Sequence, residues 1–88
     1  MPTISTFFGI LIKMNFKDAG QHNAPHFHAY YGDSEAVFGF DGEVIAGSFP
    51  VRQSAYIKAW TLLHEDALYA DWALAVNGQE TFRISPLS

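Results

Sequence analysis

Residues 26–40 read HFHAYYGDSEAVFGF and carry the strongest structural signal in the chain. Apolar and polar side chains alternate on both sides of Gly32-Asp33-Ser34, which is typical of a half-buried β-hairpin. A turn centred on Asp33 and Ser34 brings apolar side chains together three times in succession. The opposed pairs are then Tyr31–Ala36, Ala29–Phe38 and Phe27–Phe40. Because cross-strand apolar pairs stabilise a sheet, this stretch predicts an antiparallel hairpin.

The neighbouring segments extend the hairpin into a meander. Residues 4–16 alternate with period two and predict one long strand before a polar loop. Asp41-Gly42 is a second turn signal and leads into the apolar residues 44–46. A two-residue loop there would set an aromatic side chain opposite a carboxylate, so we expect a longer loop or a bulge. The sequence thus predicts an antiparallel β-meander of three to four strands.

After Pro50 the apolar period changes from that of a strand to that of a helix. Two amphipathic stripes predict helices over 51–64 and 66–77, with Asn77-Gly78 as the stop signal. Residues 81–85 are expected to form a short last strand. The predicted fold class is α+β, with both helices packed on one face of the sheet. The side chains expected beneath the helices are Phe8, Phe27, Phe38 and Ile45.

Composition limits the size and the class of the protein. The 88 residues suffice for one modest core, so we expect a single α+β domain over 1–88. With 49% hydrophobic and 16% charged residues, the chain is not of the disordered class. It has no cysteine, which excludes disulfides and thiolate metal sites and fits a cytoplasmic location. We expect no membrane association, because the longest apolar run near the N-terminus is too short to span a bilayer and no signal peptide is visible.

The charge of the chain favours some classes of partner over others. The formal net charge is −4 at pH 7, and the five basic residues are scattered. Non-specific nucleic-acid binding depends on clustered Lys and Arg, so this class of function is disfavoured. A basic protein partner suits an acidic chain better.

Three of the four histidines, His22, His26 and His28, lie within seven residues. On a strand, His26 and His28 project to the same side about 7 Å apart. Their imidazoles could converge on one divalent cation such as zinc or nickel, with His22 swinging in from the preceding loop. Two other interpretations remain open, namely a solvated, hydrogen-bonded sheet face and an acid–base or anion site.

Nearby residues could complete such a site. A carboxylate often orients a ligating imidazole through its second nitrogen, and Asp18, Glu35 and Asp41 are the candidates. In the predicted register, Asp41 stands across from His26 and Gly39 stands across from His28. Catalysis would also need a substrate cleft and a positioned base, neither of which the sequence indicates.

Several motifs spread along the chain resemble one known family. The most specific is His-Asn-Ala-Pro-His-Phe-His-Ala at 22–29, and the others are Phe8-Gly9-Ile10, Tyr31-Gly32 and the tryptophan-containing helices around Leu63-His64. Together they are similar to the bacterial domain-of-unknown-function family 4160 (DUF4160), from residue 4 to about residue 86. The family has no established biochemical activity. Its genes often neighbour another very small gene, which resembles the arrangement of toxin–antitoxin pairs.

Two classes of function follow from these observations. In the first, the chain is a protein-binding module and a toxin–antitoxin component, which docks a small protein or a second copy through a sheet edge or its helical surface. In the second, it is a small metal-dependent hydrolase or nuclease that uses His22, His26 and His28. The acidic charge favours the first class and the concentrated histidines favour the second, so the sequence leaves open whether the protein is an enzyme.

Overall fold

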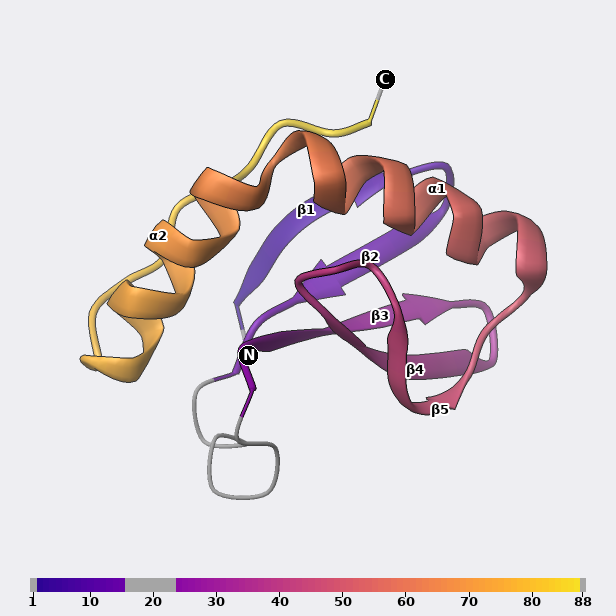
Figure 1. Cartoon of the computed structure of the whole chain (residues 1–88), viewed down its shortest axis with the longest axis horizontal. Helices are drawn as coiled ribbons and strands as arrows, with labels where there is room; N and C mark the ends of the chain where they lie inside the picture. The colour runs from indigo at the N-terminus through magenta and orange to yellow at the C-terminus, as the bar shows by residue number, and fades with distance from the viewer. Residues whose placement is uncertain (1, 16–23, 88) are drawn as a thin grey trace.

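The computed structural model describes residues 2–15 and 24–87 (Figure 1). One antiparallel sheet has its five strands in chain order: β1 (Thr3–Phe7), β2 (Ile10–Lys13), β3 (His26–Tyr31), β4 (Ser34–Gly39) and β5 (Val44–Ser48). Two helices follow, α1 (Val51–Leu63) and α2 (Glu65–Val76). The predicted α+β meander followed by two helices is confirmed, but the expected three to four strands were too few.

The additional strand arises because residues 4–16 form a hairpin rather than one long strand. Phe8 and Gly9 both have positive φ, 50° and 77°, and they make a two-residue turn that pairs Phe7 with Ile10. Such turns match the twist of the flanking strands. Phe8 therefore lies at the hairpin tip, where 49% of it is exposed, and not in the core as predicted.

The central hairpin forms with a different register from the predicted one. Its turn lies at Gly32-Asp33, where the positive φ of Gly32, 56°, suits glycine. The observed pairs are Phe27–Phe38, Ala29–Ala36 and Tyr31–Ser34, each displaced by two residues from the prediction. Because side chains alternate with period two, a shift of two leaves each residue on its predicted face.

The loop between β4 and β5 confirms the expected irregularity. The N–H of Gly39 donates to the carbonyl of Glu43 at 2.9 Å, and the register shifts between Val37 and Phe38. Gly42, with φ of 82°, lies directly against α1, and a Cβ on it would come within 2.9 Å of the Lys58 Cα. A glycine is therefore required where this loop meets the helix.

Trp60 of α1 is the centre of the packing between helix and sheet. Its side chain is fully buried, with its ring centroid 5.3 Å from that of Phe7 and 5.6 Å from that of Phe27. Phe27 and Phe38 are buried as predicted, whereas Ile45 is 45% exposed on β5. The predicted core was thus correct for the central hairpin and wrong at the two ends of the sheet.

The helices confirm the predicted break and stop. Only His64 separates α1 from α2, and α2 ends in a Schellman motif. There the N–H of Gln79 donates to the carbonyl of Leu74, and that of Gly78 to the carbonyl of Ala75. No helix in the described parts of the chain is long and apolar enough to cross a membrane.

The C-terminal segment returns past α2 toward α1 (Figure 1). Residues 81–85 do not form the predicted strand. They are nevertheless joined to β1, since the Ile84 N–H donates to the Ile4 carbonyl at 2.7 Å. Two side chains also hold the segment. The Trp60 Nε1–H donates to the Ser85 carbonyl at 2.8 Å, and Asp71 Oδ1 accepts the Phe82 N–H at 2.9 Å.

Trp60 gives the first prediction. We expect Trp60→Ala to lower the free energy of unfolding by ~3–5 kcal/mol, since it leaves a large cavity between α1 and the sheet. Trp60→Phe, which keeps an aromatic ring, should lose less and remain folded. Urea denaturation measures both, with Leu63→Ala at an exposed position as the control. If Trp60→Ala cost no more than Leu63→Ala, the proposed packing would be wrong.

Asp71 gives a prediction about pH. Its carboxyl is buried, and desolvation raises its pKa, partly offset by the hydrogen bond from Phe82. The folded protein therefore binds this proton more readily than the unfolded chain, and stability falls as pH rises from the ordinary carboxyl pKa through the raised one. Asp71→Asn keeps an acceptor for Phe82 and removes the charge.

We accordingly expect the unfolding free energy of Asp71→Asn, relative to wild type, to increase as the pH rises above the ordinary carboxyl pKa of 3.8. Denaturation series at several pH values provide the measurement. Glu80→Gln, at an exposed position, should show a flat difference over the same range. If the difference in unfolding free energy between Asp71→Asn and wild type were also independent of pH, burial would not raise the pKa of Asp71 as described.

Candidate functional site

His26 and His28 lie together on β3, as the sequence predicted. Their ring centroids are 5.7 Å apart, and they face Gly39 and Val37 of β4, on the opposite face from the Phe27–Phe38 pair. His26 is nevertheless fully buried, because Trp72 of α2 packs against its ring at 5.1 Å between centroids. For His26, the hypothesis of a solvated sheet face is therefore wrong.

Hydrogen bonding assigns the tautomer of His26. Its Nδ1 lies 3.0 Å from the backbone carbonyl of Ala24, and a carbonyl oxygen can only accept. Nδ1 is therefore the protonated nitrogen, and in the neutral ring Nε2 carries the lone pair. Metal-binding histidines commonly have this arrangement, since the carbonyl fixes both the tautomer and the ring orientation.

The predicted neighbours of the two rings need correction. Gly39 stands across from His26, not His28, because the hairpin register differs by two residues from the prediction. For the same reason Asp41 does not stand opposite His26. Of the three candidate carboxylates, Glu35 is near His28, with its Oε2 4.0 Å from Nδ1, which is longer than a hydrogen bond.

The third predicted ligand, His22, lies outside the described residues, as does Asp18. Within residues 2–15 and 24–87, no group of three His, Asp or Glu side chains is arranged to hold a metal ion. The three-histidine metal centre therefore stays a prediction, for which the structure supplies the His26–His28 pair.

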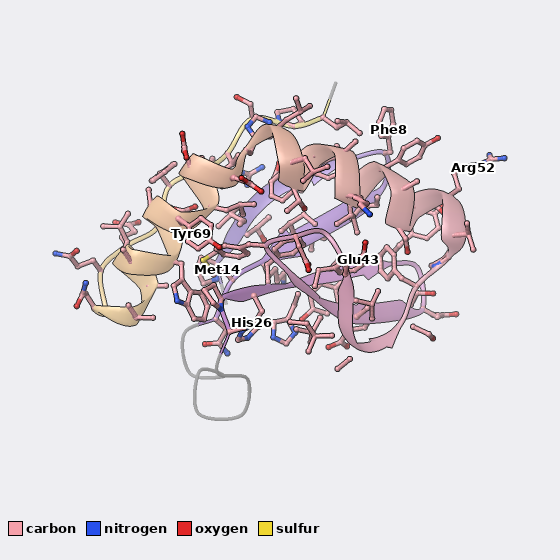
Figure 2. The ribbon with its side chains drawn as sticks, in the orientation of Figure 1. Phe8, Met14, His26, Glu43, Arg52 and Tyr69 are labelled. Carbon is pink, nitrogen blue, oxygen red and sulfur yellow. The ribbon has the colours of Figure 1, made fainter. Side chains whose placement is uncertain are left out.

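A shallow groove of about 300 Å³ lies beside this pair, at the same end of the sheet. Its lining comprises Ala24, Pro25, Gly39, Phe40, Asp41, Ile45 and Tyr69. The Phe40 and Tyr69 rings meet nearly perpendicular, with their centroids 4.9 Å apart. Figure 2 shows Tyr69 and His26 at one end of the molecule, with Phe8 and Arg52 at the other.

The groove adjoins the outer edge of the sheet at β5. In the described chain β5 pairs with β4 alone, and it contains no charged residue. Its Val44 and Ile45 side chains are exposed, and Ile45 lies both on the strand and in the groove. Free edges with exposed apolar residues are surfaces on which further strands pair.

A single ion pair lies at the start of this edge. Lys58 Nζ of α1 is 2.6 Å from Glu43 Oε1, and both side chains are largely exposed. The Glu43 carboxylate, through its hydrogen bond and its charge, raises the pKa of Lys58, and Asp41 adds to the increase. The pair therefore places one positive and one negative charge side by side at this end of β5.

Comparison with known proteins supplies the family. Residues 9–73 match the family described as Domain of unknown function (DUF4160), which includes most of the sheet, α1 and the greater part of α2. The chain belongs to this family. No curated protein and no solved structure was found to match it.

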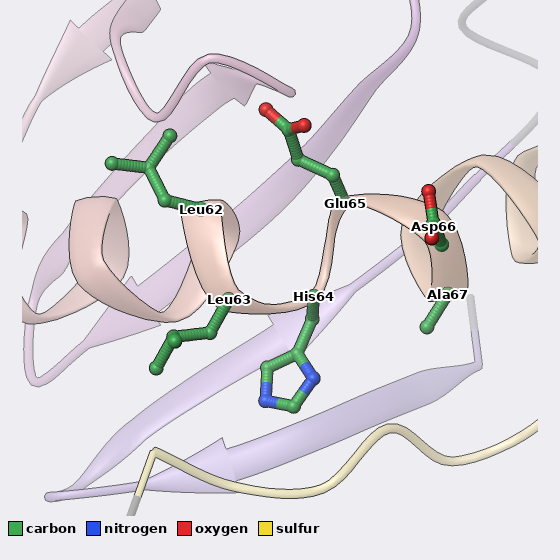
Figure 3. Close-up of a pocket in the computed structure, with 6 residues that line it drawn as sticks. All are labelled: Leu62, Leu63, His64, Glu65, Asp66 and Ala67. Atoms are coloured by element: carbon green, nitrogen blue, oxygen red, sulfur yellow. The ribbon is translucent and has the colours of Figure 1, made fainter.

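The DUF4160 chain has a second cavity, of about 350 Å³, at the junction of its two helices (Figure 3). It is lined by Leu62, Leu63, His64, Glu65, Asp66 and Ala67. In Figure 3, Leu62 and Glu65 project to one side of the junction while Leu63 and His64 project to the other. Because the side chains diverge, this cavity is the weaker candidate despite its larger volume.

Sequence reasoning missed the groove of the DUF4160 domain. In the sequence, Tyr69 falls in a predicted helix and Phe40 in a predicted strand, and neither forms a motif with Pro25. Only the bulge between β4 and β5, which leaves Ile45 without a partner opposite it, places these residues together. The sequence indicated an irregular loop there, but not the direction in which it would turn Ile45.

A zinc titration tests the histidine hypothesis. If His22, His26 and His28 share a metal, tag-free wild type should bind one zinc ion at least about tenfold more tightly than His28→Ala. The affinity should fall in mild acid, because protonated imidazoles cannot ligate. His28→Ala is preferred to His26→Ala because His26 is fully buried. Equal, weak binding by the two proteins would return the rings to a structural role.

Proposed function

We propose that this DUF4160 protein is a protein-binding module that receives its partner along the outer edge of β5. The supporting observation is the combination found on that strand. It is an edge strand, it carries exposed Val44 and Ile45, and it has no charged side chain. Charged residues and proline are two of the features that commonly protect natural edge strands, and residues 44–48 include neither, although β5 is short and bulged.

The opposite edge of the sheet is used differently. There the chain's own C-terminal segment approaches β1, and the Ile84 N–H donates to the Ile4 carbonyl. Trp60 and Asp71 hold this segment in place through the Ser85 carbonyl and the Phe82 N–H. An incoming strand therefore reaches β5 without displacing any part of the chain that the structure describes, whereas at β1 it would displace the C-terminal segment.

The partner that we propose is a small protein encoded beside this one, as in a toxin–antitoxin pair. The net charge of −4 favours a basic partner over nucleic acid. The absence of cysteine suits assembly in the reducing cytoplasm. Pairing by strand addition also suits two small proteins, because main-chain hydrogen bonds supply affinity without a deep pocket.

A second candidate function is metal-dependent hydrolysis at the histidines. The favouring observation is the hydrogen bond to Ala24, which leaves the lone pair of His26 on Nε2, beside His28. A metal held there would lower the pKa of a bound water toward ~7, as hydrolysis requires. The zinc titration described above tests the binding that this function needs.

Co-expression with the product of the adjacent small gene tests the binding function. We expect wild type to capture that protein, and Ile45→Asp to reduce capture by about tenfold or more, because a charge is placed on the docking edge. Val51→Asp is the matched control, since Val51 is also exposed and apolar but lies on α1. Equal capture by the two variants, or no capture by wild type, would contradict the proposal.

A further inference from the structure

We infer that the partner segment bound at β5 is extended and carries an apolar side chain and, two positions away on the same face, a Lys or Arg. The apolar side chain occupies the groove beside Ile45, and the cation pairs with Asp41. This inference rests on the proposed function and adds to it the chemistry of the partner.

The groove suits one apolar side chain. Its volume of about 300 Å³ is at the lower limit of the ~300–1,000 Å³ typical of small-molecule sites. Its apolar surfaces are Phe40, Ile45 and the exposed ring of Tyr69. Aromatic rings that meet edge to face, as Phe40 and Tyr69 do, give a rigid wall against which an aliphatic or aromatic group can pack.

The position of Ile45 connects the groove to the strand edge. Ile45 is part of β5 and also lines the groove, so a segment paired along β5 passes the groove at this residue. Side chains of an added strand alternate between the two faces, and pockets that receive alternate side chains provide specificity in this mode of binding. Pairing along β5 therefore places one side chain of the bound segment in the groove.

The charges around β5 predict the charge of the second side chain of the bound segment. At its start, Lys58 lies beside two carboxylates, those of Glu43 and of Asp41, so the charge there stays negative, and Asp41 itself lines the groove. At its other end, Ser48 pairs with Glu35, and Arg52 projects away from the sheet (Figure 2). A carboxylate therefore lies near each end of β5, and a basic side chain of the bound segment meets favourable charge at these two points.

The same charges argue against a second copy as the occupant. In a two-fold symmetric, antiparallel pairing of β5 with itself, the start of each strand meets the end of the other. Asp41 of one copy would then approach the Glu35 end of the other, which places like charges together. A partner that carries Lys or Arg avoids this repulsion.

Fluorescence anisotropy with synthetic peptides tests the inference. The probes are labelled peptides of about nine residues, enough to span a typical strand. One repeats Val-Thr-Lys-Thr, which places Val and Lys on one face of the strand, the second replaces each Lys with Glu, and the third replaces each Val with Gly. We expect the Val/Lys peptide to bind wild type at least about tenfold more tightly than either of the others.

Variants locate the contact. Asp41→Asn keeps an acceptor for the Glu43 N–H, which Asp41 Oδ1 accepts at 3.0 Å, and should weaken the Val/Lys peptide about two- to fivefold at low salt. Ile45→Asp should weaken it by about tenfold or more. Glu80→Gln, an equal charge change on the C-terminal segment, should leave binding unchanged. The effect of Asp41→Asn should diminish at high salt.

Equal binding of the basic and acidic peptides, or equal effects of Asp41→Asn and Glu80→Gln, would overturn the inference. Sedimentation of the protein alone as a dimer that Ile45→Asp dissociates would also overturn it, because the occupant would then be a second copy. The proposed function is tested separately, since it requires only that wild type capture the gene-neighbour protein and that Ile45→Asp reduce this capture, whatever the charge of the bound segment.

Discussion

The burial of Trp60 between α1 and the sheet is the constraint on which the rest of the structure depends. Its ring packs against Phe7 at the end of β1 and Phe27 near the start of β3, and its N–H donates to the Ser85 carbonyl. One side chain therefore connects the first hairpin, the central hairpin and the C-terminal segment. In a domain of this size, a fully buried tryptophan placed this way is a large part of the contact between helix and sheet.

This packing leaves the two edges of the sheet in different states. Trp60 and Asp71 draw the C-terminal segment to the β1 side, where Ile84 bonds Ile4. The bulge between Val37 and Phe38 shifts β5 and leaves Ile45 exposed beside the groove. The same fold thus satisfies one edge from within the chain and leaves the other accessible, which is the basis of the proposed partner-binding role.

The sequence predicted those features that depend on periodicity. Alternation over 26–40 identified the inward face of the central hairpin, and the helical stripes with Asn77-Gly78 located both helices. It failed where a single turn residue decides the outcome. Phe8 continues the alternation of its neighbours, so nothing in the pattern shows that the chain reverses there, and the positive φ of Gly32 moved the next turn by one residue.

The proximity of His26 to His28 followed from their spacing on a strand, whereas the burial of His26 depends on Trp72, forty-six positions later in the chain.

Hydrogen exchange of the backbone amides in residues 44–48, with and without the bound partner segment, tests the docking role of β5 most directly. The account predicts that the amides of β5 exchange more slowly on binding, while those of β1 and of the last residues of α1, Leu62 and Leu63, keep their rates. Protection that appears at β1 or at the helix junction, with β5 unchanged, would contradict it.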